Sequence, residues 1–360
     1  MQRRLYLDIR HFASNLLYTS RENDNKAKVE FMESICMTLP KNKSPFETYI
    51  FLRSEFIGGF IIVITPGIED LPYVLQKNGV KFFTLVAEEI TWELVDGIFI
   101  KAWGYNGSTP GPTIRVFPGD KVCIRVINQL PVHTSVHWHG LIVPNVMDGV
   151  PPIEPSPFIE PGYYFDYHFT IVNPPGTYMY HSHVDVSIQD NAGLLGGFIV
   201  EDPTMENLPN HKDYLCLLQE WAINALPWGD LTKGTYDLTF IKPDFNFFTI
   251  NGRCYPLTEP LRVRYGDMVK VRFGNIQMNH HPIHLHGHQF KVVGADGFPI
   301  APHTQICKNT ILVASGETWD ISFQANNTGI WPMHCHMPHH VTNNGVVGLG
   351  GMFTTVKYEE

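Results

Sequence analysis

Short stretches in which apolar and polar residues alternate run through the chain from about residue 81 to its end. Examples are KVCIRVIN at 121–128, YFDYHFTIV at 164–172, MVKVRFGN at 268–275 and WDISFQA at 319–325. Alternation of this kind places every second side chain on one face of a β-strand. The stretches are rich in β-branched and aromatic residues, and Gly, Pro, Asn and Asp separate them about every ten residues. The pattern predicts an all-β fold of short strands arranged as Greek-key β-sandwiches.

Two pairs of segments that lie far apart in the chain resemble each other. Residues 114–140 (IRVFPGDKVCIRVINQLPVHTSVHWHG) align with 261–287 (LRVRYGDMVKVRFGNIQMNHHPIHLHG), so that a Gly-Asp pair and two histidines coincide. Downstream, residues 175–202 parallel 328–356, beginning with PGTYMYHSH and TGIWPMHCH. A repeat with this spacing indicates two copies of one domain.

The repeat sets the expected domain boundaries. We place the first domain at residues 81–203 and the second at 212–358, with the Pro-containing stretch EDPTMENLPN at 201–210 between them.

Residues 1–80 lie outside the repeat and are expected to form an N-terminal extension of unknown fold. Within it the pattern favours a strand at 3–12 and an amphipathic helix at 25–39. The extension contains no cluster of chemically active residues, so we expect it to cover a surface or an oligomer interface. His11 is expected to be a structural histidine.

Composition narrows the class of protein. The formal charge of −9 and the absence of a basic run argue against a nucleic-acid partner. The first residues lack the apolar run of a signal peptide, and the stretch at 56–68 is too short to span a membrane. A soluble chain without export, cytoplasmic or cell-associated, is therefore expected. Scattered cysteines without a pairing pattern predict free thiols; they are Cys36, Cys123, Cys216, Cys254, Cys307 and Cys335.

Histidines gather in four motifs at the ends of predicted strands. Each H-x-H directs two imidazoles from one strand face toward a common point. Four such motifs, at corresponding places of two repeats, are a strong sign of metal binding. The motifs use ten of the eighteen histidines: His137 and His139; His181 and His183; His281, His284 and His286; His334, His336 and His340.

The tripeptide His334-Cys335-His336 belongs to two sites at once if it lies in a strand, because the cysteine then faces away from both histidines. Imidazoles without carboxylate or further thiolates suit copper better than a closed structural zinc site. His281, Cys335 and His340 make up the His₂Cys set of a blue-copper electron-transfer centre.

The motifs HWHG, HSH, HPIHLHGH and HCH…H resemble those of multicopper oxidases of the laccase type, in the same order, from about residue 81 onward. The resemblance implies two tandem cupredoxin domains and four coppers: one type 1, one type 2 and a type 3 pair. His281, Cys335 and His340 would bind type 1 copper, and His137 and His284 type 2. The type 3 ligands would be His139, His181, His183, His286, His334 and His336.

The resemblance further implies one-electron oxidation of a small-molecule reductant at type 1 copper and four-electron reduction of dioxygen to water at the trinuclear cluster. Asp148, in NVMDGVP, matches an acidic residue of the family and is a candidate proton donor or relay, although an Asp-Gly pair also makes turns. His280, His288 and His339 lie beside ligand positions, where surface or supporting roles are expected.

Most laccases have three such domains, whereas this chain has two. It resembles two-domain laccases and, in size, copper nitrite reductases, both of which form trimers with metal sites between subunits, so a homotrimer is expected. A nitrite reductase is disfavoured because its site needs no imidazole on each side of the copper cysteine. Ser182 stands in the first repeat where Cys335 stands in the second, which leaves one type 1 site per chain.

Three functions remain open from the sequence. The first is a laccase-like oxidase of phenols and aromatic amines. The second is a metallo-oxidase of Mn(II), Fe(II) or Cu(I), which needs an acidic entry site near type 1 copper. The third is a non-catalytic coat or copper-sequestering protein, which the complete ligand set argues against.

The axial position of type 1 copper departs from the family. Many members have Met, Leu or Phe five residues after the last type 1 histidine, where this chain has Gly345. We expect an absent or apolar axial neighbour, such as Val346, with Met352 as the alternative if the glycine-rich loop folds back. On that basis Gly345→Met is predicted to lower the type 1 potential and Met352→Leu to change little.

Overall fold

The computed structural model describes residues 63–205, 210–240 and 243–359. Within these ranges nearly all regular structure is strand, and the one α-helix is α4 (Val186–Ala192). The predicted all-β class is therefore confirmed. The expectations for a strand at 3–12, a helix at 25–39 and a structural His11 lie outside the described residues. Short 3₁₀ turns are η1 (Asn145–Met147), η2 (Pro203–Met205), η3 (Pro302–Thr304) and η4 (Pro338–Val341).

The strands form four sheets, two in each domain. Sheet I has the order β12-β4-β3-β6-β8 with β2 on β3: β2 (Tyr73–Leu75), β3 (Val80–Val95), β4 (Ile98–Tyr105), β6 (Lys121–Asn128), β8 (Tyr164–Thr170), β12 (Gly234–Asp237). Sheet II has the order β5-β10-β9-β7: β5 (Gly111–Val116), β7 (His137–His139), β9 (Gly176–His181), β10 (Leu195–Val200).

Sheets III and IV make up the second domain. Sheet III has the order β1-β11-β15-β21-β17-β18 with β13 on β11 and β19 on β17: β1 (Val63–Ile64), β11 (His211–Trp221), β13 (Phe247–Ile250), β15 (Met268–Asn275), β17 (Phe290–Ala295), β18 (Phe298–Pro299), β19 (Cys307–Lys308), β21 (Thr318–Gln324). Sheet IV has the order β14-β23-β22-β16-β20: β14 (Leu261–Val263), β16 (His281–Leu285), β20 (Thr310–Val313), β22 (Ile330–Cys335), β23 (Phe353–Tyr358).

Strand pairing reproduces the sequence repeat. In sheet II the order β5-β10-β9-β7 combines one parallel and two antiparallel pairs, and β14-β23-β22-β16 in sheet IV combines them in the same way. In sheet I β6 lies between β3 (parallel) and β8 (antiparallel), as β15 does between β11 and β21 in sheet III. Each domain is thus a two-sheet sandwich of the same topology.

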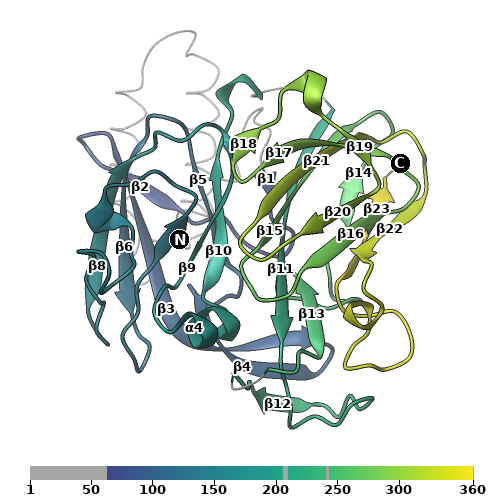
Figure 1. The fold of residues 1–360 in the computed structure, drawn as a ribbon, viewed down its shortest axis with the longest axis horizontal. Coiled ribbons are helices and arrows are strands. Elements are labelled where there is room, and N and C mark those ends of the chain that lie inside the picture. Colours follow the sequence, from purple (N-terminus) through teal and green to yellow (C-terminus); the bar gives the residue numbers. More distant parts are fainter. Residues whose placement is uncertain (1–62, 206–209, 241–242, 360) are drawn as a thin grey trace, which may run out of the picture. The chain divides into compact units, whose positions relative to one another are not determined.

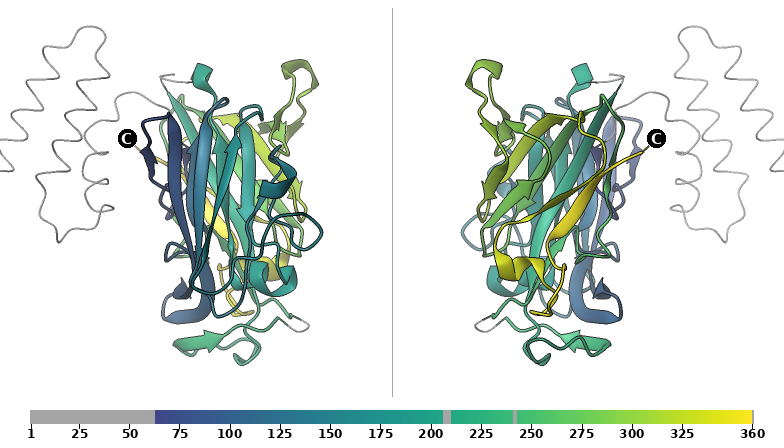
Figure 2. Two further views of the ribbon diagram at one scale, coloured as in Figure 1. Left: turned by 90° about the vertical axis from the view of Figure 1, so that its left-hand side faces the viewer. Right: turned by 90° about the vertical axis from the view of Figure 1, so that its right-hand side faces the viewer.

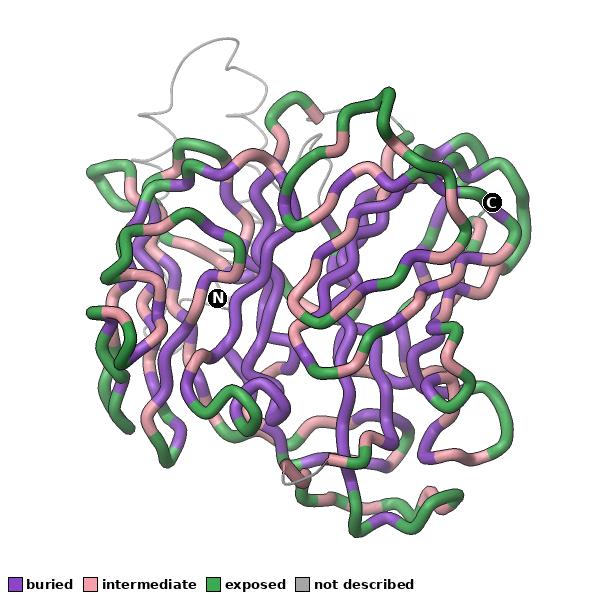
Figure 3. The backbone as a smooth tube through the Cα atoms, viewed as in Figure 1, coloured by how far each residue is buried: buried purple, intermediate pink, exposed green. Residues whose placement is uncertain are grey.

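The four sheets follow one another as layers I, II, III and IV, from left to right in Figure 1. Figure 2 shows that their strands run in roughly one direction, and Figure 3 shows that the inner strands are largely buried. One core fills the space between sheets I and II, including Phe83, Trp138 and Phe198. A second core fills the space between sheets III and IV, including Phe273 and Cys335.

Two segments cross the domain boundary expected from sequence. Strand β1 pairs with β11 of the second domain, and β12, from the second repeat, extends sheet I by pairing with β4. Strand β3 begins at Val80, one residue before the expected start of the first domain, and β2 pairs with it. Leu71 is buried in the first core as well.

The described residues also bear on membrane helices and on the cysteines considered in the sequence. None of the helices among the described residues has the length and apolar character needed to cross a membrane. The five cysteines within the described ranges are free thiols.

A buried ion network joins the domains where sheet II meets sheet III. Arg272 on β15 donates two hydrogen bonds to Asp213, at 2.7 and 2.8 Å, and one to the hydroxyl of Thr177 on β9, at 2.9 Å. Asp320 accepts from the same hydroxyl at 2.6 Å and lies 3.3 Å from Arg272. Because these side chains are at most a tenth exposed, the guanidinium balances two buried carboxylates.

Arg272→Met is expected to lower the apparent free energy of unfolding by about 3–5 kcal/mol, because it leaves Asp213 and Asp320 buried without their shared cation. Chemical denaturation followed by tryptophan fluorescence measures this. The control is Lys233→Met, which removes an interdomain pair with Asp96 whose side chains are 67% and 75% exposed and which should cost less than about 1 kcal/mol. Equal losses for the two variants would contradict a dominant role for the buried network.

Candidate metal centres

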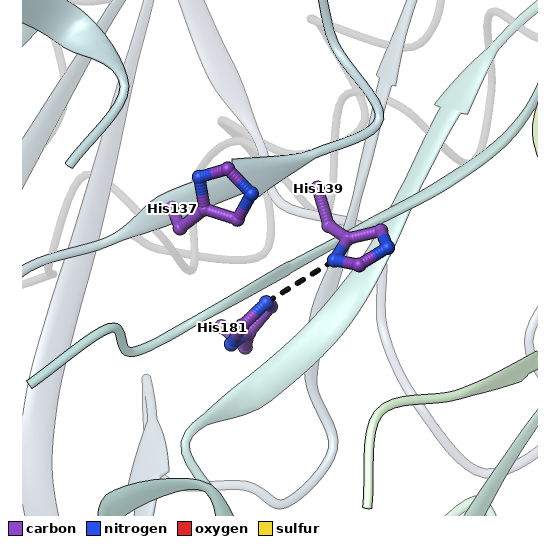
Figure 4. Close-up of side chains that lie close together, drawn as sticks. All are labelled: His137, His139 and His181. Carbon is purple, nitrogen blue, oxygen red and sulfur yellow. Dashed lines mark hydrogen bonds between the residues drawn. The ribbon is translucent and has the colours of Figure 1, made fainter. Parts of the chain in front are cut away.

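The first histidine group consists of His137, His139, His181 and His183. On β7 the side chain of Trp138 enters the core of the first domain, so the two flanking histidines face the other way. Antiparallel pairing sets His137 opposite His181. The ring of His137 lies 5.4 Å from those of both His181 and His183. Figure 4 shows three of these side chains gathered at one point.

Hydrogen bonds orient the rings of the first histidine group. His137 Nδ1 donates to the carbonyl of Asp148 at 2.9 Å, and His181 Nδ1 to that of Ser182 at 2.7 Å, which leaves Nε2 free in both rings. His139 donates from Nε2 to Gly316 O at 2.9 Å, which leaves its Nδ1 free. This Nδ1 lies 3.3 Å from His181 Nε2, close enough for the two nitrogens to share one metal ion.

The second histidine group consists of His284, His286, His334 and His336, and it repeats this arrangement. Strands β16 and β22 set His284 opposite His334. His284 Nδ1 donates to Asn309 O at 2.7 Å, and His334 Nδ1 to Cys335 O at 2.9 Å. His286 Nε2 and His334 Nε2 lie 3.0 Å apart. Each domain therefore carries a group of four histidines on equivalent strands.

Burial favours the neutral, metal-binding form of four histidines in these groups. Burial, reinforced by the neighbouring imidazoles, lowers the pKa of His139 to about 4. Burial is also the main cause that lowers the pKa of His137, His286 and His334. Neutral imidazoles with free ring nitrogens suit a cation.

The two histidine groups lie in separate places in the folded chain. His139 stands opposite Met179, which packs between sheets II and III, so the first group lies on the side of its domain that faces sheet III. His284 lies on the face of sheet IV that points away from the core shared with sheet III. Among the described residues no ring contact or hydrogen bond joins the groups, and Figure 1 shows sheet III between β9 and β22.

His281, Cys335 and His340 form a third group, here called the buried triad, and all three side chains are 0% exposed. Cys335 Sγ lies 3.4 Å from His340 Nδ1 and 4.0 Å from His281 Nδ1, and the two nitrogens lie 3.2 Å apart. A triangle of this size lets all three donors reach one ion at about 2.0–2.3 Å. The residues fit the His₂Cys set of a blue-copper site.

Strand alternation separates the buried triad from the second histidine group, as predicted. Ile283 and Cys335 form a cross-strand pair on the inner face, and both pack in the second core. His284 and His334 form the adjacent pair on the outer face. The sequence assigned His340, not His339, to the triad, and in the structure His340 Nδ1 lies 3.4 Å from Cys335 Sγ.

Burial governs the electrostatics of the buried triad. It lowers the pKa of His281 and His340 to about 3, so both stay neutral, and it raises the pKa of the Cys335 thiol to about 12. Metal binding must therefore displace the thiol proton. Glu220 is also fully buried, and burial raises its pKa to about 7. One of its oxygens lies 3.7 Å from His281 Nε2.

Met352 is better placed beside the buried triad than Gly345. The Met352 N–H donates to His340 O at 2.8 Å, and its carbonyl accepts from the Cys335 N–H at 3.0 Å. Its side chain is buried in the same core as Cys335. At Gly345, φ is +72° and a Cβ would lie 2.1 Å from the Trp228 ring. Gly345→Met would therefore disturb the loop rather than add a ligand, so this substitution is unsuitable as a test of the axial position.

Asp148 lies at the first histidine group and also makes a turn. Its carboxylate is 3.3 Å from His137 Nδ1. The next residue, Gly149, has φ +85°, and a Cβ there would lie 1.9 Å from Val136 O, so only glycine fits. The structural and the chemical interpretation of the Asp-Gly pair are therefore compatible.

The remaining candidates lie around these groups. His288 is buried and bonds Tyr358 Oη at 2.8 Å, a structural role. His280 and His339 are exposed. Cys123, Asp166 and His168 also bring ligand atoms close together, but both Asp166 oxygens accept hydrogen bonds from Arg125.

Sequence reasoning missed several residues that support these sites. Asp190 in α4 lies 3.1 Å from His181 Nδ1, and no histidine motif contains it. Phe248 on β13 stacks on His340 at 3.7 Å, and Glu220 approaches His281 from β11. All three reach their histidines through tertiary packing. A buried acid inside the apolar strand LCLLQEW was the one available signal.

Comparison with known proteins agrees with the geometry. Two family descriptions, both "Multicopper oxidase", match residues 87–205 and 227–350. The chain is 31% identical to multicopper oxidase MmcO of Mycobacterium tuberculosis over 66% of this chain and 50% of that protein. It is 32% identical to laccase-1 of Cryptococcus neoformans over 83% of this chain and 51% of that protein. It thus spans about half the length of these curated relatives.

A solved structure matches over most of its own length. The blue copper oxidase from Nitrosomonas europaea is 32% identical, with a TM-score of 0.67 over 77% of this chain and 85% of that one. Together with the tandem matches, this likeness places both sandwiches and the histidine motifs in one family. The chain belongs to the multicopper oxidases.

Proposed function

We propose that this protein is a laccase-like oxidase that couples one-electron oxidation of aromatic donors to the four-electron reduction of dioxygen to water. The observation that carries the proposal is the pairing of β16 with β22. This pairing points the Cys335 side chain toward the buried triad, and the side chain of His334, one residue away, toward the second histidine group. Electrons collected at one site thereby have a covalent route to the other.

The ligand assignment follows the three groups. The buried triad would hold type 1 copper. His137 and His284, which occupy equivalent strand positions and donate from Nδ1 to carbonyls, would hold type 2 copper. The other six histidines of the two groups would hold the type 3 pair. When bound, copper supplies reversible one-electron redox chemistry and a site for dioxygen.

The assembly is proposed to be a homotrimer in which the second histidine group of one subunit meets the first histidine group of the next. Support comes from the separation of the groups by sheet III, and from their equivalent placement on one side of each domain. Such a contact is heterologous, and it closes into a ring when the rotation per subunit allows it.

Asp148 is proposed to supply protons for water formation together with Glu154. Burial, the charge of Asp148 and a hydrogen bond with its carboxyl raise the pKa of Glu154. A carboxyl with a raised pKa keeps its proton to higher pH and can then donate it. Because Asp148 also touches His137, that proton lies beside the proposed dioxygen site.

Uncharged surroundings of the buried triad favour an aromatic donor over a metal cation. The flanking segments 221–229 and 336–352 contain no Asp, Glu, Lys or Arg. The carboxylate of Asp230, which follows, bonds Thr232, and Glu220 is buried. A metallo-oxidase needs exposed carboxylates at this entrance.

Cys335→Ser is expected to abolish the intense blue thiolate-to-copper absorption and oxygen uptake with a phenol, because the triad loses its sulfur ligand. Copper bound by the histidine groups should remain. Absorption spectroscopy, copper analysis and an oxygen electrode measure these quantities. Cys307→Ser removes an exposed thiol outside the site and should change none of them.

The wild-type protein should consume one dioxygen molecule for every four phenol molecules that it oxidises. It should consume little dioxygen when Mn(II) or Fe(II) is the donor. Faster uptake with either metal ion would favour the metallo-oxidase. A fully copper-loaded protein that consumes no oxygen with any donor would defeat both oxidase functions.

Met352→Leu is expected to raise the type 1 reduction potential, because a thioether stabilises Cu(II) more than a hydrocarbon does. A redox titration of the blue absorption measures this. Met333→Leu is the matched control, since Met333 is equally buried on the inner face of β22. The sequence alone predicted that Met352 has little influence on the type 1 potential, and the position of Met352 in the structure revises that expectation. An unchanged potential in Met352→Leu would support the earlier expectation.

Mixing two inactive variants tests the shared site. His137→Ala damages the first histidine group and His284→Ala the second, so random co-assembly should restore about one quarter of the interfaces. Oxygen uptake after joint dissociation and reassembly measures this. A mixture of His137→Ala with His183→Ala, both in the first group, should recover nothing. Failure of the first mixture to recover activity would argue for sites within single chains.

A further inference from the structure

The buried triad has no ligand that a donor can touch from solution. His281, Cys335 and His340 are each 0% exposed, and the outward nitrogen of His340, Nε2, is buried without a hydrogen-bond partner. A donor therefore cannot hydrogen bond to a ligand of this centre directly. Electrons must cross at least one intervening group.

Aromatic rings cover His340. Phe248 stacks on it with ring centroids 3.7 Å apart and an angle of 15° between the planes. The ring of His339 stands edge-on to His340 at 4.3 Å and to Phe248 at 5.7 Å. Phe248 is buried, whereas His339 is exposed. His339 is thus the exposed ring in contact with a ligand ring.

The other ligand imidazole offers no comparable route. His280, which precedes His281, is exposed, but no ring contact joins it to a ligand among the described residues. The outward nitrogen of His281 faces Glu220, which is itself fully buried and accepts hydrogen bonds from the N–H groups of Met278 and Asn279. This side of the triad is closed by polar packing.

The surface around His339 suits an uncharged aromatic molecule. The His339 carbonyl accepts from Thr342 Oγ1, which in turn accepts from the N–H of Gly345. Trp228, 60% exposed, lies against Gly345. Val347 and other exposed apolar residues continue the same glycine-rich loop, which carries no charged side chain.

We propose that His339 is the electron-entry residue, on whose exposed ring a phenol or aromatic amine stacks. This rests on the proposed function of the buried triad as type 1 centre. One electron leaves the donor and crosses the touching rings of His339 and His340 to the centre, which is reduced by one electron. A phenol releases its proton to water and departs as a phenoxyl radical.

Anaerobic stopped-flow bleaching of the blue absorption by a phenol isolates this step from oxygen chemistry and from assembly. His339→Ala should lower the second-order rate constant by about threefold to tenfold, the worth of one aromatic contact. His339→Phe keeps the ring and should retain the rate. His280→Ala removes the other exposed imidazole adjacent in sequence to a ligand and should leave it unchanged. The blue absorption and reduction potential should stay constant in all three.

Other outcomes overturn the proposal in distinguishable ways. An unchanged rate in His339→Ala removes the residue from the path. A faster rate shows that its ring shields His340 and does not conduct. If His280→Ala lowers the rate constant equally, removal of any exposed imidazole near the site has this effect, and His339 has no special role. If the wild-type protein shows no blue absorption, or none that a phenol bleaches, the proposed function itself fails.

Discussion

The two-sidedness of a β-strand is the constraint on which the metal sites depend. Neighbouring residues of a strand face opposite ways, so β22 can place Cys335 in a dry core and His334 on the surface without any special loop. The partner strand β16 repeats this division with Ile283 and His284. A shift of one residue in this register would exchange core and surface and destroy both sites together. The geometry of both sites therefore depends on the same core packing that fixes the strand register of the sandwich.

Local pattern and repetition made the fold class, the two sandwiches and the histidine motifs predictable from sequence. The pairing of β1, from the expected N-terminal extension, with β11 and of β12, from the second repeat, with β4 could not be predicted, because pairing between distant segments leaves no periodic trace. The choice of His340 over His339 was already made from the histidine motif, whereas the stacking of Phe248 on His340 depends on the packing of β13 and could not be predicted. Asp190 and Glu220 likewise reach their histidines through tertiary contacts that no motif spacing encodes.

The interface between sheets II and III combines apolar contact with a satisfied ion network. Leu195, Ile199 and Leu215 pack between the sheets, and Arg272 bridges acids beside them. Buried charges that satisfy one another in one geometry disfavour sliding of one domain over the other. The network thereby helps to hold the two histidine groups in one relative arrangement within the chain, which the proposed sharing of ligands between copies would require.

The separation of the two histidine groups also bears on chains that have been made but not yet assembled. A lone subunit of the proposed trimer can collect an electron at its buried triad but lacks a complete place to use it. Under that proposal it would not reduce dioxygen part-way to superoxide or peroxide while its neighbours are missing. If the proposed trimer forms, division of the ligands between two sheets would make oxygen reduction depend on assembly and hence on protein concentration.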